Sequence, residues 1–259
     1  MNQPLAFVHP QAKIAANVVI EPFVTIEKDV EVGDGTWIGP NVTIMNGARI
    51  GKNCKIFPGA VVSAIPQDLK FEGEETIATI GDNVTIRECV TINRGTKHSN
   101  KTVVGNNTLL MAYVHVAHDS VVGDNCILAN GVTLAGHVNI NDYAIVGGLC
   151  AVHQFVNIGQ HVMISGGSLV RKDVPPFTKA AREPLSYVGI NSIGLRRRGF
   201  SPESITEIQE IYRTLYLKGL NTSQAMELVE AEMPPTTERD EILSFSRASE
   251  RGLMKGYYQ

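Results

Sequence analysis

Four of the seven histidines of this 259-residue chain lie between residues 115 and 153, and one of them is followed directly by a carboxylate. That pair is His118 and Asp119. An imidazole beside a carboxylate is the usual arrangement of a general base that works near neutral pH, with the carboxylate orienting the ring. His115, His137 and His153 complete the group. These residue types favour removal of a proton from a bound substrate.

The elements that must position these side chains follow a period of six residues. From Val8 to Val170, 25 of the 28 positions taken every sixth residue are Ile, Val or Leu, and the exceptions are Asp68, Glu74 and His98. Six is not a helical period, because 3.6 residues per turn would carry every second aliphatic residue off the buried face. Gly or Asn, which tolerate positive φ, recurs three places after many of the aliphatic residues. Each hexad is therefore predicted to be one short strand and one turn.

Three hexads complete a triangular coil of 18 residues, and stacked coils pair their strands at about 4.8 Å. The aliphatic run is uninterrupted from residue 104 to residue 170, so residues 18 apart there should lie one above another. The predicted columns at one edge are His118 with Gly136 and Gln154, Asp119 with His137, and His153 on the other side.

Gly136 adds a second chemical group to this edge. It should lie about 5 Å from His118, and its N–H is not crowded by a side chain. Such a donor can stabilise the oxyanion that develops during acyl transfer. No Gly-x-Ser-x-Gly motif occurs, and Cys126 and Cys150 fall at inward positions, so a covalent acyl-enzyme is not expected. Direct attack of an acceptor on a thioester, with His118 taking the proton, is the simpler mechanism.

Zinc ligation is the sharpest alternative, because three or four imidazoles could bind a metal ion. The group lacks an accompanying acidic or cysteine ligand pair, so we expect no metal and no other cofactor. A non-catalytic scaffold is the third possibility, although it has no reason to gather histidines beside Asp119. The cysteines contain no CxxC pair and are interpreted as reduced packing residues; they are Cys54, Cys89, Cys126 and Cys150.

Composition excludes several classes of protein. The net charge of -3 argues against a general nucleic-acid binder, which needs a basic excess to neutralise phosphates. No stretch approaches 18 uninterrupted apolar residues, and the first ten residues lack the features of a signal peptide. We therefore expect a cytoplasmic protein without a segment inserted in the membrane.

Two polar segments, residues 63–79 and 93–103, leave the repeat, and solenoids commonly place such loops on the functional face. The repeat ends near residue 175. Helices are predicted from Ser201, as N-cap with Pro after it, from residue 221 or 222, and over residues 237–251. The expected organisation is a mainly β solenoid domain at 1–190 and a C-terminal helical domain at 191–259.

Several longer sequence motifs distinguish this chain from hexapeptide-repeat proteins in general. QDLKFEGE (67–74), TIRECVTINRGT (85–96), VHVAHDSVVGDNCILANGVTLAGHV (114–138), AIVGGLCAVHQF (144–155) and GLRRRGF (194–200) occur in this order. With them the chain resembles the acyl-ACP:UDP-N-acetylglucosamine O-acyltransferases of lipid A biosynthesis. The resemblance implies a left-handed parallel β-helix, a winding opposite to the usual crossover rule. A related N-acyltransferase normally has an extra N-terminal domain, and the hexads here begin at Val8.

The resemblance also implies an activity and a site. A cytoplasmic homotrimer would move a 3-hydroxyacyl group from acyl carrier protein to the 3-hydroxyl of UDP-N-acetylglucosamine, in active sites between adjacent solenoids. His118 would be the base, Asp119 its partner, and Gly136 the oxyanion donor. The residues implied to contact the sugar, the diphosphate or the acyl chain are Asp68, Lys70, His115, His137, His153 and Gln154.

Basic residues near the end of the chain fit a phosphate and an acidic partner. The guanidinium fork suits phosphate oxygens, and by resemblance Arg197 and Arg198, with Asn191, would hold the UDP portion. Relatives can carry an acidic residue where this chain has Ile193, so the nucleotide contact can differ. A second basic set could meet acidic acyl carrier protein; it comprises Arg171, Lys172, Lys179 and Arg182.

Overall fold

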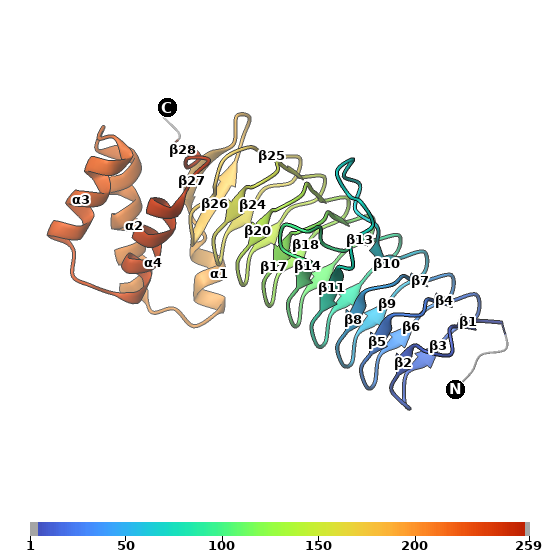
Figure 1. Ribbon diagram of the computed structural model, residues 1–259. Coiled ribbons are helices and arrows are strands. Elements are labelled where there is room, and N and C mark those ends of the chain that lie inside the picture. The colour runs from blue at the N-terminus through green and yellow to red at the C-terminus, as the bar shows by residue number, and fades with distance from the viewer. Residues whose placement is uncertain (1–4, 257–259) are drawn as a thin grey trace.

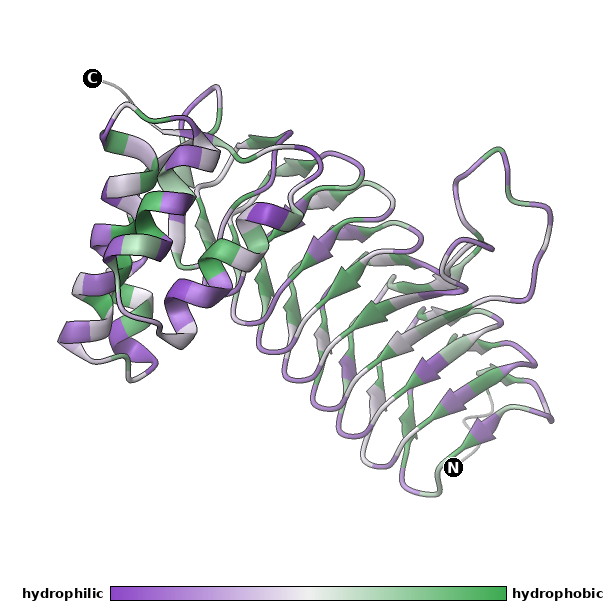
Figure 2. Ribbon diagram, turned by 60° about the vertical axis from the view of Figure 1, so that its left-hand side comes forward, coloured by the Kyte–Doolittle hydropathy of each residue, from purple (hydrophilic) through white to green (hydrophobic). Residues whose placement is uncertain are grey.

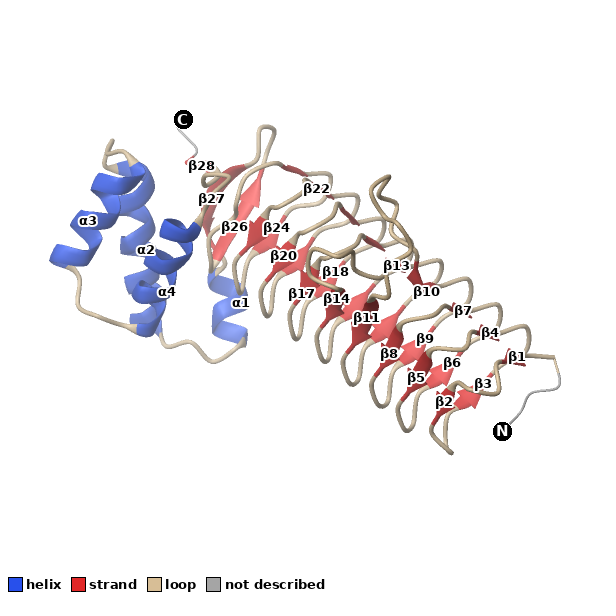
Figure 3. Ribbon diagram, in the orientation of Figure 1, coloured by secondary structure: helices blue, strands red, loops and turns tan. Residues whose placement is uncertain are grey.

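Residues 5–256 are described by the computed structural model, in which a solenoid of short parallel strands precedes a group of helices (Figure 1). The solenoid is the expected left-handed parallel β-helix. Its strands form three long sheets, one on each side of a triangular coil, and the helices lie at the C-terminal end (Figure 3).

The first sheet carries His115. Its strands pair in parallel from one coil to the next, so His115 lies between Thr91 and Thr133. Its members, in spatial order, are β1 (Phe7–Val8), β4 (Thr25–Ile26), β7 (Thr43–Ile44), β10 (Val61–Ala64), β13 (Thr91–Asn93), β16 (His115–Val116), β19 (Thr133–Leu134), β22 (Ala151–Val152) and β25 (Leu169–Val170).

The second sheet follows the corner that contains His118. It is parallel throughout, because each coil winds in the same direction. Its members are β2 (Lys13–Ile14), β5 (Val30–Val32), β8 (Ala48–Ile50), β11 (Ile77–Ile80), β14 (Lys101–Val104), β17 (Val121–Val122), β20 (Asn139–Ile140) and β23 (Asn157–Ile158).

The third sheet is the longest, because strands outside the repeat extend it. Its parallel members are β3 (Val19–Ile20), β6 (Trp37–Ile38), β9 (Lys55–Ile56), β12 (Thr85–Ile86), β15 (Leu109–Leu110), β18 (Ile127–Leu128), β21 (Ile145–Val146), β24 (Met163–Ile164) and β26 (Thr178–Ala181). The strands β27 (Ser186–Ile190) and β28 (Lys255–Gly256) then close it.

The core is the interior of the triangle. The hexad aliphatics point inward and are buried, as at Ile44 and Leu128, except for Val8 and Ile14 at the start of the solenoid, which are partly buried. The smaller residues four places later, such as Val42 and Ala60, are buried with them. Cys54 and two other cysteines are buried here, as predicted. The prediction was wrong for the fourth, Cys89, which is exposed at a corner.

The corners use positive φ angles, as the Gly and Asn pattern predicted. Asn41 has φ 58° and Asn53 has φ 54°, although Asn17 is not among the residues with positive φ. Bulkier side chains occupy the same conformation in the later coils, where the sequence pattern did not predict it, for example Tyr113 at 63° and Leu149 at 60°. Such residues are strained in this region, so the surrounding coils must impose it.

The two interruptions of the repeat are loops, but they are shorter than predicted. The first runs between β10 and β11 and extends away from the coils, and hydrophilic residues make up much of it (Figure 2). The second runs between β13 and β14. Residues at the ends of each predicted loop pair as strands, because β11 and β14 lie side by side in register from Ile77 with Lys101 to Ile80 with Val104.

The hexad repeat ends near residue 175, as predicted, but the third sheet continues beyond it, because β26 still pairs in parallel with β24. The strand β27 then pairs antiparallel with β26 in the same sheet, and β28, near the end of the chain, pairs in parallel with β27. Residues 1–4 and 257–259 of the expected domains lie outside the described residues, and the division at residue 190 stays a prediction.

Four described helices lie in the chain between β27 and β28 of the third sheet. Ser201 caps a helix that starts at Pro202, and Asn221 caps the next, as predicted. Tyr212 is fully buried, donates a hydrogen bond to the carbonyl oxygen of Pro176 and stacks on Tyr187, so it joins the helices to the final coil. No described helix is both long and apolar enough to cross a membrane. The helices are α1 (Ser192–Arg197), α2 (Pro202–Leu217), α3 (Thr222–Glu232) and α4 (Thr237–Ala248).

Candidate active site

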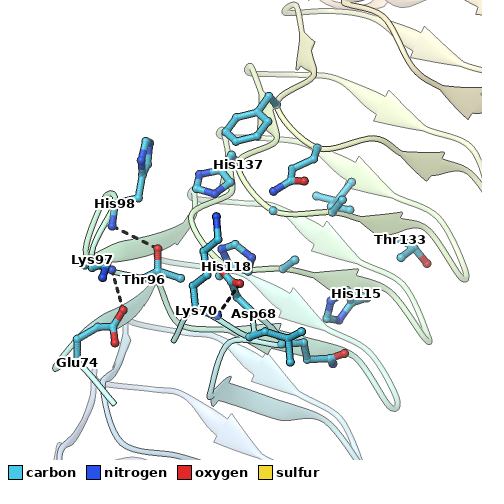
Figure 4. Close-up of a pocket in the computed structure, with 18 residues that line it drawn as sticks. Asp68, Lys70, Glu74, Thr96, Lys97, His98, His115, His118, Thr133 and His137 are labelled. Carbon is cyan, nitrogen blue, oxygen red and sulfur yellow. Dashed lines mark hydrogen bonds between the residues drawn. The ribbon is translucent and has the colours of Figure 1, made fainter. Parts of the chain in front are cut away.

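A cavity of about 1170 Å³ lies over the corner that follows β16 (Figure 4). Three coils supply its floor, and both interruptions of the repeat supply its walls. It collects most of the predicted site residues: Asp68, Lys70, His115, His118, Gly136, His137 and Gln154.

His118 and Asp119 form a buried pair at the base of this cavity. His118 Nδ1 lies 2.8 Å from Asp119 Oδ2, and the two residues are only 7% and 5% exposed. An ionised carboxylate only accepts hydrogen bonds, so Nδ1 carries the proton and Nε2 is left unprotonated in the neutral ring. The predicted pairing of these two side chains is confirmed, and its geometry suits a base that acts through Nε2.

The carboxylate of Asp119 is kept ionised by its hydrogen bonds. Burial opposes its charge, but hydrogen bonds from Ser99, His118 and Thr96 lower its pKa to about 2. The Thr96 hydroxyl lies 2.7 Å from Oδ2, and the Thr96 amide lies 3.1 Å from Oδ1. The Asp119 amide in turn donates to the Thr102 hydroxyl at 2.9 Å. Asp119 is thus a fixed negative charge throughout the physiological pH range.

Gly136 lies directly on the imidazole of His118. A Cβ built at Gly136 would be 2.6 Å from His118 Cε1 and 2.7 Å from Nε2, so any side chain there would displace the ring. In the described part of the chain, the Gly136 amide donates no main-chain hydrogen bond. The predicted column therefore places a free N–H donor beside the basic nitrogen.

His137 forms the outer wall of the cavity. Its ring meets the His118 ring edge-on at 5.1 Å and stacks on Phe155 at 4.5 Å. His98, from the loop between β13 and β14, meets its edge at 4.6 Å (Figure 4). Burial lowers the pKa of His137, which makes the neutral ring its main form near pH 7. Its buried Nδ1 has no hydrogen-bond partner among the described residues, and a substrate polar group would satisfy it.

The remaining predicted residues of the cavity surround this centre. His115 lies in β16, with Nδ1 2.7 Å from the Thr91 hydroxyl, and burial lowers its pKa. Asp68 and Lys70 come from the loop between β10 and β11, where the Asp68 carboxylate accepts a hydrogen bond from the Lys70 amide (Figure 4). This loop therefore adds charged side chains to a cavity whose lining residues from the coils are mostly uncharged.

Besides Asp119, which lies behind His118, four predicted residues do not line the cavity. His153 lies outside it, with Nδ1 3.1 Å from the Gln154 carbonyl oxygen. The other three, Asn191, Arg197 and Arg198, belong to α1 and its caps. Arg198 donates to the Tyr143 carbonyl oxygen at 2.9 Å, which places it at the next corner along the coil.

Among residues 5–256, one group of side chains could hold a metal ion by its geometry. Possible ligand atoms of His118, Asp119 and His137 lie within 4.8 Å of one another. However, Asp119 already accepts hydrogen bonds on both oxygens, and His118 Nδ1 is committed to one of them. The donor set therefore fits a hydrogen-bonded base better than a metal centre.

Sequence reasoning missed several residues of the site. Thr96, Ser99 and His98 lie in a segment that breaks the repeat, so no column rule could place them. Phe155 could have been found, because it lies one full coil after His137 in the uninterrupted part of the repeat.

Comparisons with family models agree with this architecture. A model described as UDP N-acetylglucosamine O-acyltransferase, domain 2, matches residues 173–254. The bacterial transferase hexapeptide model (six repeats) matches residues 101–136. A model of the GMPPB C-terminal domain matches residues 2–106.

Relatives match over nearly the whole chain. An acyl-(acyl-carrier-protein):UDP-N-acetylglucosamine O-acyltransferase of Aquifex aeolicus is 55% identical over 256 residues, covering 94% of this chain and 98% of the relative. The enzyme of that name from Sulfurihydrogenibium is 52% identical, covering 96% of this chain and 93% of the relative.

Solved structures give the same result. The UDP-N-acetylglucosamine acyltransferase of Bacteroides fragilis is 54% identical with a TM-score of 0.97, covering 98% of this chain and all of that one. That of Francisella novicida is 42% identical with a TM-score of 0.96, covering 98% of this chain and 94% of that one. The chain therefore belongs to the acyl-(acyl-carrier-protein):UDP-N-acetylglucosamine O-acyltransferase family.

Proposed function

We propose that this enzyme transfers a 3-hydroxyacyl group from acyl carrier protein to the 3-hydroxyl of UDP-N-acetylglucosamine, a step of lipid A biosynthesis. The observation that carries the proposal is the buried His118–Asp119 pair, 2.8 Å apart, beneath the free N–H of Gly136. The relatives named as acyl-(acyl-carrier-protein):UDP-N-acetylglucosamine O-acyltransferases, which match 94% and 96% of this chain, support it.

The reaction needs one base and one oxyanion donor. His118 Nε2 removes the proton of the sugar hydroxyl as its oxygen attacks the thioester carbonyl carbon. A C–O bond forms, and the Gly136 N–H stabilises the oxyanion of the tetrahedral intermediate. Asp119 stabilises the imidazolium. The C–S bond then breaks, and the leaving thiolate receives the proton from His118. The enzyme forms no covalent bond to the acyl group.

The cavity walls supply contacts for the acceptor. His137, with its unpaired Nδ1, suits a sugar hydroxyl or carbonyl, and Gln154 lines the same cavity. Lys70 is exposed at the rim and suits a phosphate, while Asp68 fixes the turn that carries it. His115 and His153 would contact more distant parts of the two substrates.

A homotrimer would complete the site. Within one chain the basic run lies at a different corner from His118, so a neighbouring solenoid would deliver Asn191, Arg197 and Arg198 to the UDP portion. Exposed apolar side chains support such packing, because Tyr113 is 67% and Leu149 76% exposed, each at a strained corner.

The donor protein would dock near the end of the solenoid. A cavity of about 390 Å³ there combines apolar residues, such as Leu169 and Pro184, with Arg171 and Lys172. Acyl carrier protein is acidic, so this basic rim would attract it, with Lys179 and Arg182 close by in sequence. We place the reaction in the cytoplasm, where both substrates would be available.

Product analysis tests the proposal. Purified protein is incubated with UDP-N-acetylglucosamine and 3-hydroxyacyl carrier proteins of several chain lengths, and products are identified by mass spectrometry. We expect a mono-acylated sugar nucleotide from the wild type, almost none from His118→Ala, and wild-type amounts from His9→Ala, a histidine of the first coil. Absence of product with every chain length would refute the donor or acceptor assignment, and a 3-amino sugar nucleotide would be tested next.

A further inference from the structure

The carboxylate of Asp119 is held by a segment that is not part of the solenoid. This segment, residues 94–100, connects β13 to β14 and bends over the corner that follows β16. Its Thr96 hydroxyl donates to Oδ2, and its Ser99 hydroxyl and amide donate to Oδ1. The catalytic pair therefore depends on a loop as well as on the column of coils.

The segment is built to reach that carboxylate. A Cβ at Gly95 would lie 2.3 Å from the Lys101 amide nitrogen, so only glycine allows the two ends of the loop to approach this closely. The Thr76 hydroxyl donates to the Gly95 carbonyl oxygen at 2.6 Å, and the Asn100 amide donates to the Thr96 carbonyl oxygen at 2.8 Å. The positions of Thr96 and Ser99 are thus fixed from both sides.

The two hydroxyls make the shortest bonds from this segment to the carboxylate oxygens. Oδ1 accepts from the Ser99 hydroxyl and from the Thr96 amide, and Oδ2 lies between the Thr96 hydroxyl and His118 Nδ1. The main-chain amides of Thr96 and Ser99 also donate to this carboxylate, at 3.1 to 3.2 Å, but the shorter bonds from the two hydroxyls restrain it most tightly against rotation about its Cβ–Cγ bond, because χ2 of Asp is a broad, soft torsion. A turned carboxylate would no longer hold the proton on Nδ1.

We propose that Thr96 and Ser99 are positioning residues for the general base: their hydroxyls fix Asp119 so that Oδ2 accepts from His118 Nδ1, which leaves Nε2 for the acceptor hydroxyl. This inference rests on the proposed acyl transfer. Thr96 carries most of the effect because it is buried, whereas Ser99 is exposed and water can replace its hydroxyl.

Isosteric replacement tests the role of the buried hydroxyl. Thr96→Val should lower kcat about tenfold, the size expected for one hydrogen bond to a charged group, with KM little changed. Thr96→Ser should restore kcat. Thr108→Val is the matched control, because Thr108 is a buried threonine whose hydroxyl bonds the Gly123 carbonyl oxygen far from the cavity, and its kcat should equal that of the wild type.

A double-mutant cycle separates positioning from a general loss of stability. In an Asp119→Ala background, Thr96→Val should cause no further loss of kcat, because its target is already absent. An equal loss in both backgrounds, or an unchanged kcat for Thr96→Val in the wild-type background, would overturn the proposal.

A readout that needs no turnover distinguishes this proposal from the reaction itself. The Asp119 carboxyl carbon is followed by NMR as the pH is varied, and Thr96→Val should raise the pKa from its value of about 2. A raised pKa in a protein that makes no product would refute the acyl transfer alone. An unchanged pKa would refute the positioning role.

Discussion

Two neighbouring corners of the solenoid are built alike but differ in charge. One holds His137, at φ 60°, stacked on Phe155, and the other holds His161, at φ 57°, stacked on Tyr143 at 4.8 Å. Burial lowers the pKa of both histidines. The first corner adds the Asp119 carboxylate, whereas the second adds a guanidinium, whose Nη1 lies 3.3 Å from His161 Nδ1.

The two corners also differ in the segments that pack over them. At the His137 corner, a cavity remains open, and its sides are formed by the loops between β10 and β11 and between β13 and β14. The His161 corner is covered by aromatic side chains from the C-terminal region, because Phe177 stacks on the ring and Phe200 meets its edge. The repeat therefore supplies equivalent histidine corners, while the inserted loops and the added charge decide which of them can perform chemistry.

Apart from removal of the base itself, the largest loss of activity is expected from a change at Gly136. Gly136→Ala puts a methyl group 2.6 Å from His118 Cε1, so the imidazole must move. We expect kcat to fall about 10²-fold, the cost of misplacing a catalytic group by roughly 1 Å. Steady-state kinetics measures it, with circular dichroism as the control for folding. A kcat within twofold of the wild type, in a folded variant, would show that His118 does not act from this position.

The next largest effect concerns the guanidinium of the second corner. Arg198→Ala should raise KM for UDP-N-acetylglucosamine about tenfold, because a charge-assisted contact to a phosphate is lost, while kcat changes little. Arg196→Ala, an exposed neighbour on α1, is the matched control and should leave KM unchanged. Equal KM values for both variants would mean that Arg198 only contacts His161 and Tyr143 and does not bind the nucleotide.

A smaller effect is expected from the ring that supports His137. Phe155→Ala removes a stacking contact of about 1 kcal/mol, so kcat/KM should fall about fivefold. Phe23→Ala offers a control in an early coil, because Phe23 is also exposed and also has φ 64°. The same loss in both variants would point to the corner conformation and not to the stacking.

The smallest expected effect is a change in the pH dependence of the unfolding free energy, caused by His161 at the second corner. Burial and the Arg198 charge lower the pKa of His161 from 6.5 to about 4, so between these pH values the unfolded chain binds a proton that the folded chain does not. Stability from this group is present above pH 6.5 and is lost as the pH falls toward 4. His161→Phe should lessen the drop in unfolding free energy between pH 7 and pH 5, measured with urea. An identical drop in the variant would contradict the assignment.

Periodicity in the sequence predicted the features that depend on it. The inward aliphatics follow from the hexad, and the position of Gly136 beside the His118–Asp119 pair follows from the stacking of one coil on the next. Contacts made by the interruptions could not be predicted, because a loop's path depends on tertiary packing. Thr96 therefore reaches Asp119, far along the chain, with no signal in the sequence.

The strands that follow the hexad repeat were harder to predict for a related reason. The aliphatic period fades after Val170, but β26, β27 and β28 continue the sheet through backbone hydrogen bonds that need no hexad. Bulky residues at corners, such as Tyr143, also escaped prediction, since their positive φ opposes their intrinsic preference.

The most direct test of the account compares the two corners by turnover at saturating substrate, in His118→Ala and His161→Ala. We predict that kcat falls by about 10²- to 10⁴-fold in His118→Ala, the usual contribution of a general base, and stays within about threefold of the wild type in His161→Ala. A comparable loss in both variants, or the larger loss in His161→Ala, would contradict the claim that the His118–Asp119 pair performs the proton transfer.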